Sequence, residues 1–198
     1  MSVYGFIFVD PGYGGTGLAV FKEDDEEKVS FQYVASTVIK ETHLAKQKPN
    51  AFRFEIIAHD SIQWLEDVRK KTFGKEYPYK ILRYAQATIE MPTLWGGSAK
   101  SYASGVKGQL TTLAALGGYL AGCFTSRLLS PNIIFVTPDH WKGQLSKEAV
   151  IARIHRVKSM RGPLKNLPER VCDHEADAIG MALWSRYGSS LLPERAVT

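Results

Sequence analysis

Five stretches of the chain carry the hydrophobic patterns of β-strands. Residues 3–9 form an apolar run that is short enough for a buried strand. Residues 17–21 and 29–39 follow it after polar turns, so the first three stretches predict a meander of antiparallel strands. Two more strands are predicted at 80–90 and 132–136, each separated from the preceding strand by a helical pattern.

Helical patterns cover much of the remaining chain. A helix is expected from Asp60 or Ser61, either of which suits an N-cap, to about Thr72. Residues 40–57 are ambiguous, and 46–50 have the composition of a loop. Further helices are predicted at 102–126, 146–157 and 173–187. The resulting order, βββαβαβαα, predicts an α/β fold with a mixed sheet flanked by helices.

The composition is that of an ordinary globular protein. A chain of 198 residues suits a single domain, and 44% of it is hydrophobic and 23% charged. No apolar run approaches the length of a membrane span, and the first residues do not resemble a secretion signal. Only Cys123 and Cys172 are present, which favours a reducing compartment. We therefore expect a cytoplasmic protein without a membrane partner.

The positive charge is concentrated in one region. The net charge is +5, and residues 138–170 hold eight Lys and Arg against three acids, which accounts for the whole excess. The basic residues are Lys142, Lys147, Arg153, Arg156, Lys158, Arg161, Lys165 and Arg170. Such a stripe indicates a polyanionic partner, with nucleic acid the first choice. The alternative is a solvated helix face.

The last predicted helix begins with several candidate metal ligands. Residues three or four apart lie on one side of a helix, so Asp177 lies one turn from both Asp173 and His174. Buried carboxylates repel one another unless a cation compensates them, which suggests a divalent metal. The alternative is an N-cap with acids that favour a helix N-terminus.

Two further acids stand at the ends of predicted strands. Asp10 precedes a glycine-rich turn whose Gly12, Gly14 and Gly17 match the dinucleotide-binding spacing, but that motif requires a helix where this chain predicts a strand. Glu90 ends a later strand, where it could instead pair with an arginine at the rim. Taken with Asp177, these acids predict an oxygen-rich site for a hard cation such as Mg²⁺.

The chain resembles the RuvC-like Holliday junction resolvases of the RNase H-like nuclease superfamily. The matching pieces follow the family's order along nearly the whole chain. They are Asp10-Pro11-Gly12 with Thr16-Gly17, Glu90, Val136-Thr137-Pro138, Trp141-Lys142-Gly143 and Ala176-Asp177-Ala178. The resemblance implies an RNase H-like fold, with the antiparallel meander followed by parallel strands, in a single domain spanning 1–198.

The resemblance also implies an activity and a ligand set. It implies a homodimeric endonuclease that binds two Mg²⁺ or Mn²⁺ ions and makes paired nicks in four-way junctions, leaving 5′-phosphate and 3′-hydroxyl ends. Asp10, Glu90 and Asp177 match the family's catalytic acids. The fourth catalytic position, three residues before the last acid, is His174, and Asp173 is the rival metal ligand.

The chain departs from the family in length and in one aromatic residue. The stretch between Asp10 and Glu90 is longer than in bacterial members, with an insertion around 40–80 that resembles phage-type relatives. Trp95 is the nearest candidate for a base-stacking aromatic, or else a core residue. Lys107 joins the expected DNA contacts, which otherwise come from the basic stripe: Lys142, Lys147, Arg153, Arg156, Lys158, Arg161 and Lys165.

Other functions remain compatible with these patterns. A nuclease of the same fold could act on other branched DNA or on RNA, and a non-catalytic nucleic-acid-binding module could retain the fold. An ATP-binding domain of the sugar-kinase and actin type also places an Asp-x-Gly hairpin near phosphate, but such proteins duplicate the domain and are longer.

Overall fold

The protein is built around a five-stranded mixed sheet with the strand order β3-β2-β1-β4-β5. The computed structural model describes residues 3–12, 14–24, 31–41, 49–73, 82–93, 108–128, 131–143, 145–160 and 166–188. The strands are β1 (Val3–Asp10), β2 (Gly15–Asp24), β3 (Gln32–Lys40), β4 (Leu82–Glu90) and β5 (Asn132–Val136). Strands β1, β2 and β3 are antiparallel, and β4 and β5 run parallel to β1, which confirms the predicted sheet.

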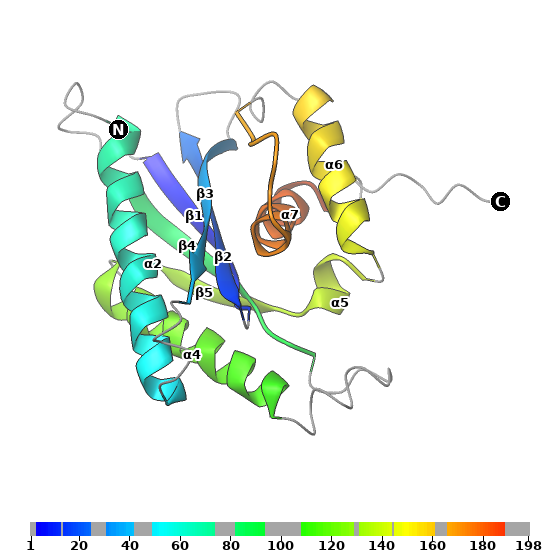
Figure 1. Ribbon diagram of the computed structural model, residues 1–198. Helices are drawn as coiled ribbons and strands as arrows, with labels where there is room; N and C mark the ends of the chain where they lie inside the picture. Colours follow the sequence, from blue (N-terminus) through cyan, green and yellow to red (C-terminus); the bar gives the residue numbers. More distant parts are fainter. Residues whose placement is uncertain are drawn as a thin grey trace.

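Helices cover both faces of this sheet (Figure 1). On one face lie α2 (Asn50–Phe73) and α4 (Gln109–Arg127), and on the other lies α7 (Asp173–Tyr187). The helix α6 (Lys147–Met160) packs on α7, and the single turn α5 (Pro138–Trp141), which was not predicted, follows β5. Among the described helices, none combines the length and the apolar character that crossing a bilayer requires.

The central strand β1 is apolar on both faces because both faces are covered. Ile7 and Val9 pack into the cluster beneath α2 and α4, whereas Phe8 belongs to the cluster beneath α7. A parallel strand buried on both sides reads as a nearly continuous apolar run, as residues 3–9 do. By the same alternation, Asp10 at the end of β1 faces α7.

The predicted start of α2 was wrong by about ten residues. The helix begins at Asn50, where the backbone amides of Phe52 and Arg53 already bond to the carbonyl of Pro49. Arg53 also forms a partly buried ion pair with Glu41 at 2.7 Å, which links the first turn of the helix to the residue after β3. Ser61 is fully buried within the helix and caps nothing. The described part of the expected insertion is therefore mainly one long helix.

The other boundaries agree closely with the predictions. The helix predicted at 173–187 is α7, and the strand predicted at 132–136 is β5. Helix α4 begins at Gln109, after Gly108 in the left-handed conformation at φ 69°. The predicted start of that helix, at 102–107, and the start of the third strand, at 29–30, lie outside the described residues.

Candidate active site

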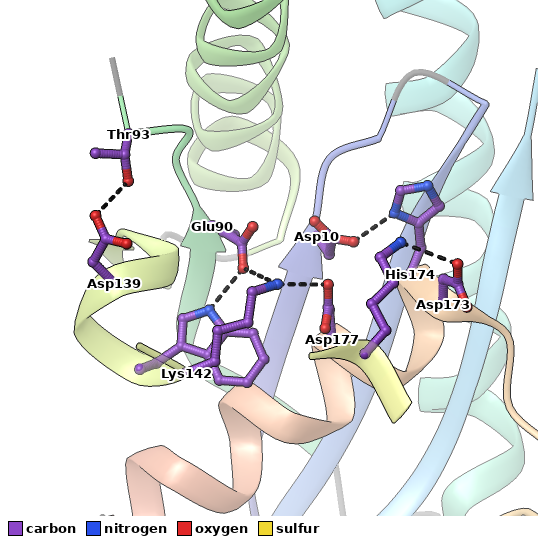
Figure 2. Close-up of polar contacts among 10 residues, drawn as sticks. Asp10, Glu90, Thr93, Asp139, Lys142, Asp173, His174 and Asp177 are labelled. Carbon is purple, nitrogen blue, oxygen red and sulfur yellow. Dashed lines mark hydrogen bonds and ion pairs between the residues drawn. The ribbon is translucent and has the colours of Figure 1, made fainter. Parts of the chain in front are cut away.

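Three acidic side chains converge at one edge of the sheet (Figure 2). Asp10 is the last residue of β1, Glu90 is the last residue of β4, and Asp177 lies in the second turn of α7. One carboxylate oxygen from each lies within 4.8 Å of the others. Because β1 and β4 are parallel neighbours, their carboxyl ends share one edge of the sheet. The structure thus brings together the three acids selected from the sequence.

Two glycines in the first hairpin allow α7 to approach the sheet. Gly17 pairs with Asp10 across the hairpin, and a Cβ atom there would overlap the carbonyl group of His174. A Cβ atom on Gly12 would overlap the imidazole ring of His174. The glycine spacing therefore permits close packing of the helix start, which brings Asp177 within reach of the strand ends.

His174, and not Asp173, contacts the acidic cluster. Its Nδ1 lies 2.6 Å from Oδ2 of Asp10, and this hydrogen bond raises the pKa of His174 against the opposing effect of burial. Asp173 is exposed and pairs with Lys147 at 3.0 Å. Figure 2 shows the contact of His174 with Asp10 as a dashed line. Of the two rival ligands, His174 is the one that faces Asp10.

Glu175 anchors the start of α7, a role not predicted from the sequence. It closes a capping box with Cys172 at the N-cap and also accepts a hydrogen bond from Ser36 of β3. Tyr33 lies 2.6 Å from the same serine hydroxyl. The S/T-x-x-E pattern that normally predicts such a box is incomplete here, because a cysteine replaces the usual serine or threonine.

Lys142 extends its ammonium group between the carboxylates. Its Nζ lies 2.8 Å from Asp177 and 3.8 Å from Glu90. Burial alone would lower the pKa of Lys142, but Glu90 and Asp177 outweigh it and hold the pKa above its usual value. The sequence predicted a lysine that grips DNA phosphates. The structure places its amine inside the acidic cluster.

Burial raises the pKa of two of the carboxyl groups, those of Glu90 and Asp177. It raises the pKa of Glu90 to about 7, with the charge of Asp10 adding to the effect and Lys142 and Trp141 opposing it. Burial also raises the pKa of Asp177, again against Lys142. The site thus holds three carboxylates, and Lys142 offsets only part of their negative charge. Carboxylate oxygens in such a cluster suit a hard divalent cation such as Mg²⁺ or Mn²⁺.

The predicted DNA-contacting residues divide into three groups. Lys147, Arg153, Arg156 and Lys158 lie on α6, where Arg156 is exposed and Nη1 of Arg153 is buried without a hydrogen-bond partner among the described residues. Lys142 lies in the acidic cluster. Trp95, Lys107, Arg161 and Lys165 lie outside the described residues.

Comparisons with solved structures found several proteins that this chain resembles. RuvC from T. thermophilus, determined in complex with a Holliday junction substrate, superimposes with a TM-score of 0.54 at 17% identity, over 94% of this chain and 97% of that chain. The yeast mitochondrial Holliday junction resolvase Ydc2 gives 0.47 at 13% identity, over 94% and 79% of the two chains. The fowlpox virus Holliday junction resolvase gives 0.45 at 13% identity, over 95% and 99%.

The superposition with RuvC confirms the predicted RNase H-like fold over most of the chain. In sequence, no protein-family model and no curated protein matches this chain.

Proposed function

We propose that this protein is a metal-dependent, structure-selective DNA endonuclease that resolves four-way junctions by paired nicks. The observation that carries the proposal is the convergence of Asp10, Glu90 and Asp177 within 4.8 Å at the sheet edge. The RuvC-like fold supports it, since the matched RuvC was determined with a Holliday junction. A fold alone hosts many activities, so the acids weigh more than the superposition.

The buried acids are the residues that would hold the metal. Asp10, Glu90 and Asp177 would bind two Mg²⁺ or Mn²⁺ ions, with His174 as the fourth ligand. When bound, two such metal ions would activate a water molecule and stabilise the negative charge on the leaving 3′ oxygen. Hydrolysis would then leave 5′-phosphate and 3′-hydroxyl ends. A metal-binding histidine is neutral and offers its unprotonated ring nitrogen, so His174 would bind the ion as the neutral imidazole.

Lys142 has a defined part in this scheme. Its ammonium group balances the negative charges of Asp177 and Glu90. Without it, these two buried carboxylates would repel each other and the nearby carboxylate of Asp10. Only 17% of its side chain is exposed, so it cannot serve mainly as a surface contact to distant phosphates. We assign it to charge balance within the site.

The remaining basic residues would bind the DNA backbone. Helix α6 carries Lys147, Arg153, Arg156 and Lys158 and packs on α7, close to the acidic edge. Backbone contacts of this kind make binding fall steeply with salt. Paired nicks in two strands need two active sites, so the active species would be a homodimer bound to branched DNA.

The experiment is a cleavage panel with a four-way junction, a flap, a duplex and an RNA–DNA hybrid, each with Mg²⁺ and with Mn²⁺. The wild-type chain should nick the junction, and Asp10→Asn should abolish nicking while still binding the junction in a gel-shift assay. Asp67→Asn, on the exposed face of α2, is the matched control and should cleave normally. Undiminished cleavage by Asp10→Asn would refute the proposal.

The other arms of the panel separate the alternatives. Cleavage restricted to the flap or to the hybrid would make this a nuclease of the same fold with another substrate. Junction binding without cleavage under either ion would make it a non-catalytic binding module.

A further inference from the structure

A buried tryptophan is bonded directly to one of the three acids. Trp141 is the last residue of α5, and only 4% of its surface is exposed. Its indole Nε1–H donates a hydrogen bond to Oε2 of Glu90 at 2.7 Å. A tryptophan has one such donor, and here it is directed at a carboxylate of the site. A hydrogen bond with a charged acceptor is among the stronger kinds.

The indole ring is held in place from the side opposite to Glu90. Gly180 of α7 faces the ring, and a Cβ atom at that position would lie 2.8 Å from Cζ3 of Trp141 and 3.0 Å from a methyl group of Val150. The absence of a side chain at residue 180 therefore admits the indole between α7 and α6. On another side, the ammonium group of Lys142 lies 4.9 Å from the ring centroid.

The carboxylate of Glu90 has more rotational freedom than the carboxylates of the two aspartates. A glutamate has one more side-chain torsion than an aspartate, and Glu90 stands at the very end of β4. Among the described residues, its short contact is the one with Trp141, since Lys142 lies further away at 3.8 Å. Asp10 and Asp177 likewise each have one partner within 3 Å, His174 and Lys142 respectively, so Trp141 is to Glu90 what these residues are to the two aspartates.

We propose that Trp141 is a positioning residue that fixes the carboxylate of Glu90 in the orientation needed to bind metal, with Gly180 providing the space for its ring. The inference rests on the proposed function, because it takes Glu90 as a metal ligand. Hydrogen-bond partners behind metal ligands commonly set the metal affinity, and their loss costs about 10- to 100-fold.

The first test is a Mn²⁺ titration of the full chain by calorimetry. Trp141→Phe keeps an aromatic ring but removes the N–H donor, and should raise the Kd for Mn²⁺ about tenfold or more. The matched control is Trp184→Phe, since Trp184 borders the same apolar pocket but packs against His140 at 5.0 Å between ring centroids. Its Kd should stay within about threefold of wild type, the range of an ordinary substitution away from the ligands.

A double-mutant cycle separates positioning from a general loss of structure. If Trp141 acts through Glu90, Trp141→Phe should change the Kd by less than about twofold when Glu90→Ala is already present. Gly180→Ala is a second variant that presses on the indole from α7 and leaves every ligand intact, and it should also weaken Mn²⁺ binding. Equal effects of Trp141→Phe in both backgrounds would overturn the inference.

A spectroscopic measurement reports on the hydrogen bond without any metal. In protein labelled with ¹⁵N-tryptophan, the Trp141 indole resonance, assigned by its loss in Trp141→Phe, should move on Glu90→Gln and on adding Mg²⁺. Asp173→Asn should leave it in place. An unchanged Trp141 indole chemical shift in Glu90→Gln would overturn the inference.

The two proposals can fail separately. A wild-type chain that binds Mn²⁺ and cleaves junctions, paired with a Trp141→Phe variant of equal affinity, overturns only the positioning role. A wild-type chain that neither binds Mn²⁺ nor cleaves any substrate overturns the proposed function, and the positioning role with it.

Discussion

Replacing Glu90 with glutamine should stabilise the metal-free protein, and the gain should grow with pH. The ordinary pKa of a glutamate is 4.5, whereas burial, with Asp10 adding to the effect, raises the pKa of Glu90 to about 7. Between these values the folded state binds more protons than the unfolded state. The free energy of unfolding therefore falls as the pH rises from about 4.5 to about 7, and the loss is complete above the folded-state pKa.

The size of this effect follows from the same pKa values. One pKa unit corresponds to about 1.4 kcal/mol, so ionised Glu90 should cost the folded state about 3 kcal/mol at pH 8. Its side chain is only 12% exposed, which limits solvent screening. Glutamine has no such charge to bury, and its amide oxygen can still accept the Trp141 hydrogen bond.

Urea denaturation in EDTA, at pH values from 5 to 8, measures the difference. Glu90→Gln should match wild type near pH 5 and exceed it by about 3 kcal/mol at pH 8, a Tm gain of about 6 to 12 °C for a chain of this size. Glu169→Gln, at an exposed position, should stay within about 0.5 kcal/mol of wild type throughout. A difference that does not change with pH would refute the reasoning.

Three further predictions test the packing and the ligands. Gly17→Ala should destabilise the protein by more than about 2 kcal/mol in thermal unfolding, because its Cβ would overlap the start of α7, whereas Gly118→Ala on the open face of α4 should be neutral or stabilising. Lys142→Met should lower the free energy of unfolding in EDTA by about 3 kcal/mol, because it leaves buried carboxylates without a compensating charge. Adding Mg²⁺ should raise the stability of this variant more than that of wild type. A variant as stable as wild type in EDTA would contradict this prediction. His174→Ala should raise the Kd for Mn²⁺ about 100-fold and Asp173→Asn less than about threefold, and the reverse order would assign the fourth ligand to Asp173.

The acids could be predicted because their positions are local properties of the sequence. Asp10 and Glu90 each end an apolar strand, and Asp177 interrupts the apolar face of a helix, so each is conspicuous without knowledge of its neighbours. The partners that complete the site could not be found in this way. The contacts of Trp141 and Lys142 with Glu90 join residues about 50 positions apart, and they depend on side-chain directions that no local pattern encodes.

The error at α2 has a related cause. A polar Asp60-Ser61 pair next to apolar residues is the ordinary pattern of an N-cap, whereas residues 40–57 upstream gave an ambiguous pattern. The contact that fixes the true start is the ion pair of Arg53 with Glu41, across a stretch that offers no periodic pattern. Helix boundaries that depend on tertiary contacts of this kind cannot be predicted from the local sequence pattern.

The order in which the site's residues occur along the chain bears on its synthesis. The acids stand at positions 10, 90 and 177, and the third belongs to the last described helix. A ribosome-bound chain therefore builds β1 and β4 while it still lacks Asp177, His174 and the helix that buries Asp10. An incomplete nascent chain holds only two of the three acids. The proposed nuclease activity would consequently require that α7 has been made and has docked on the sheet.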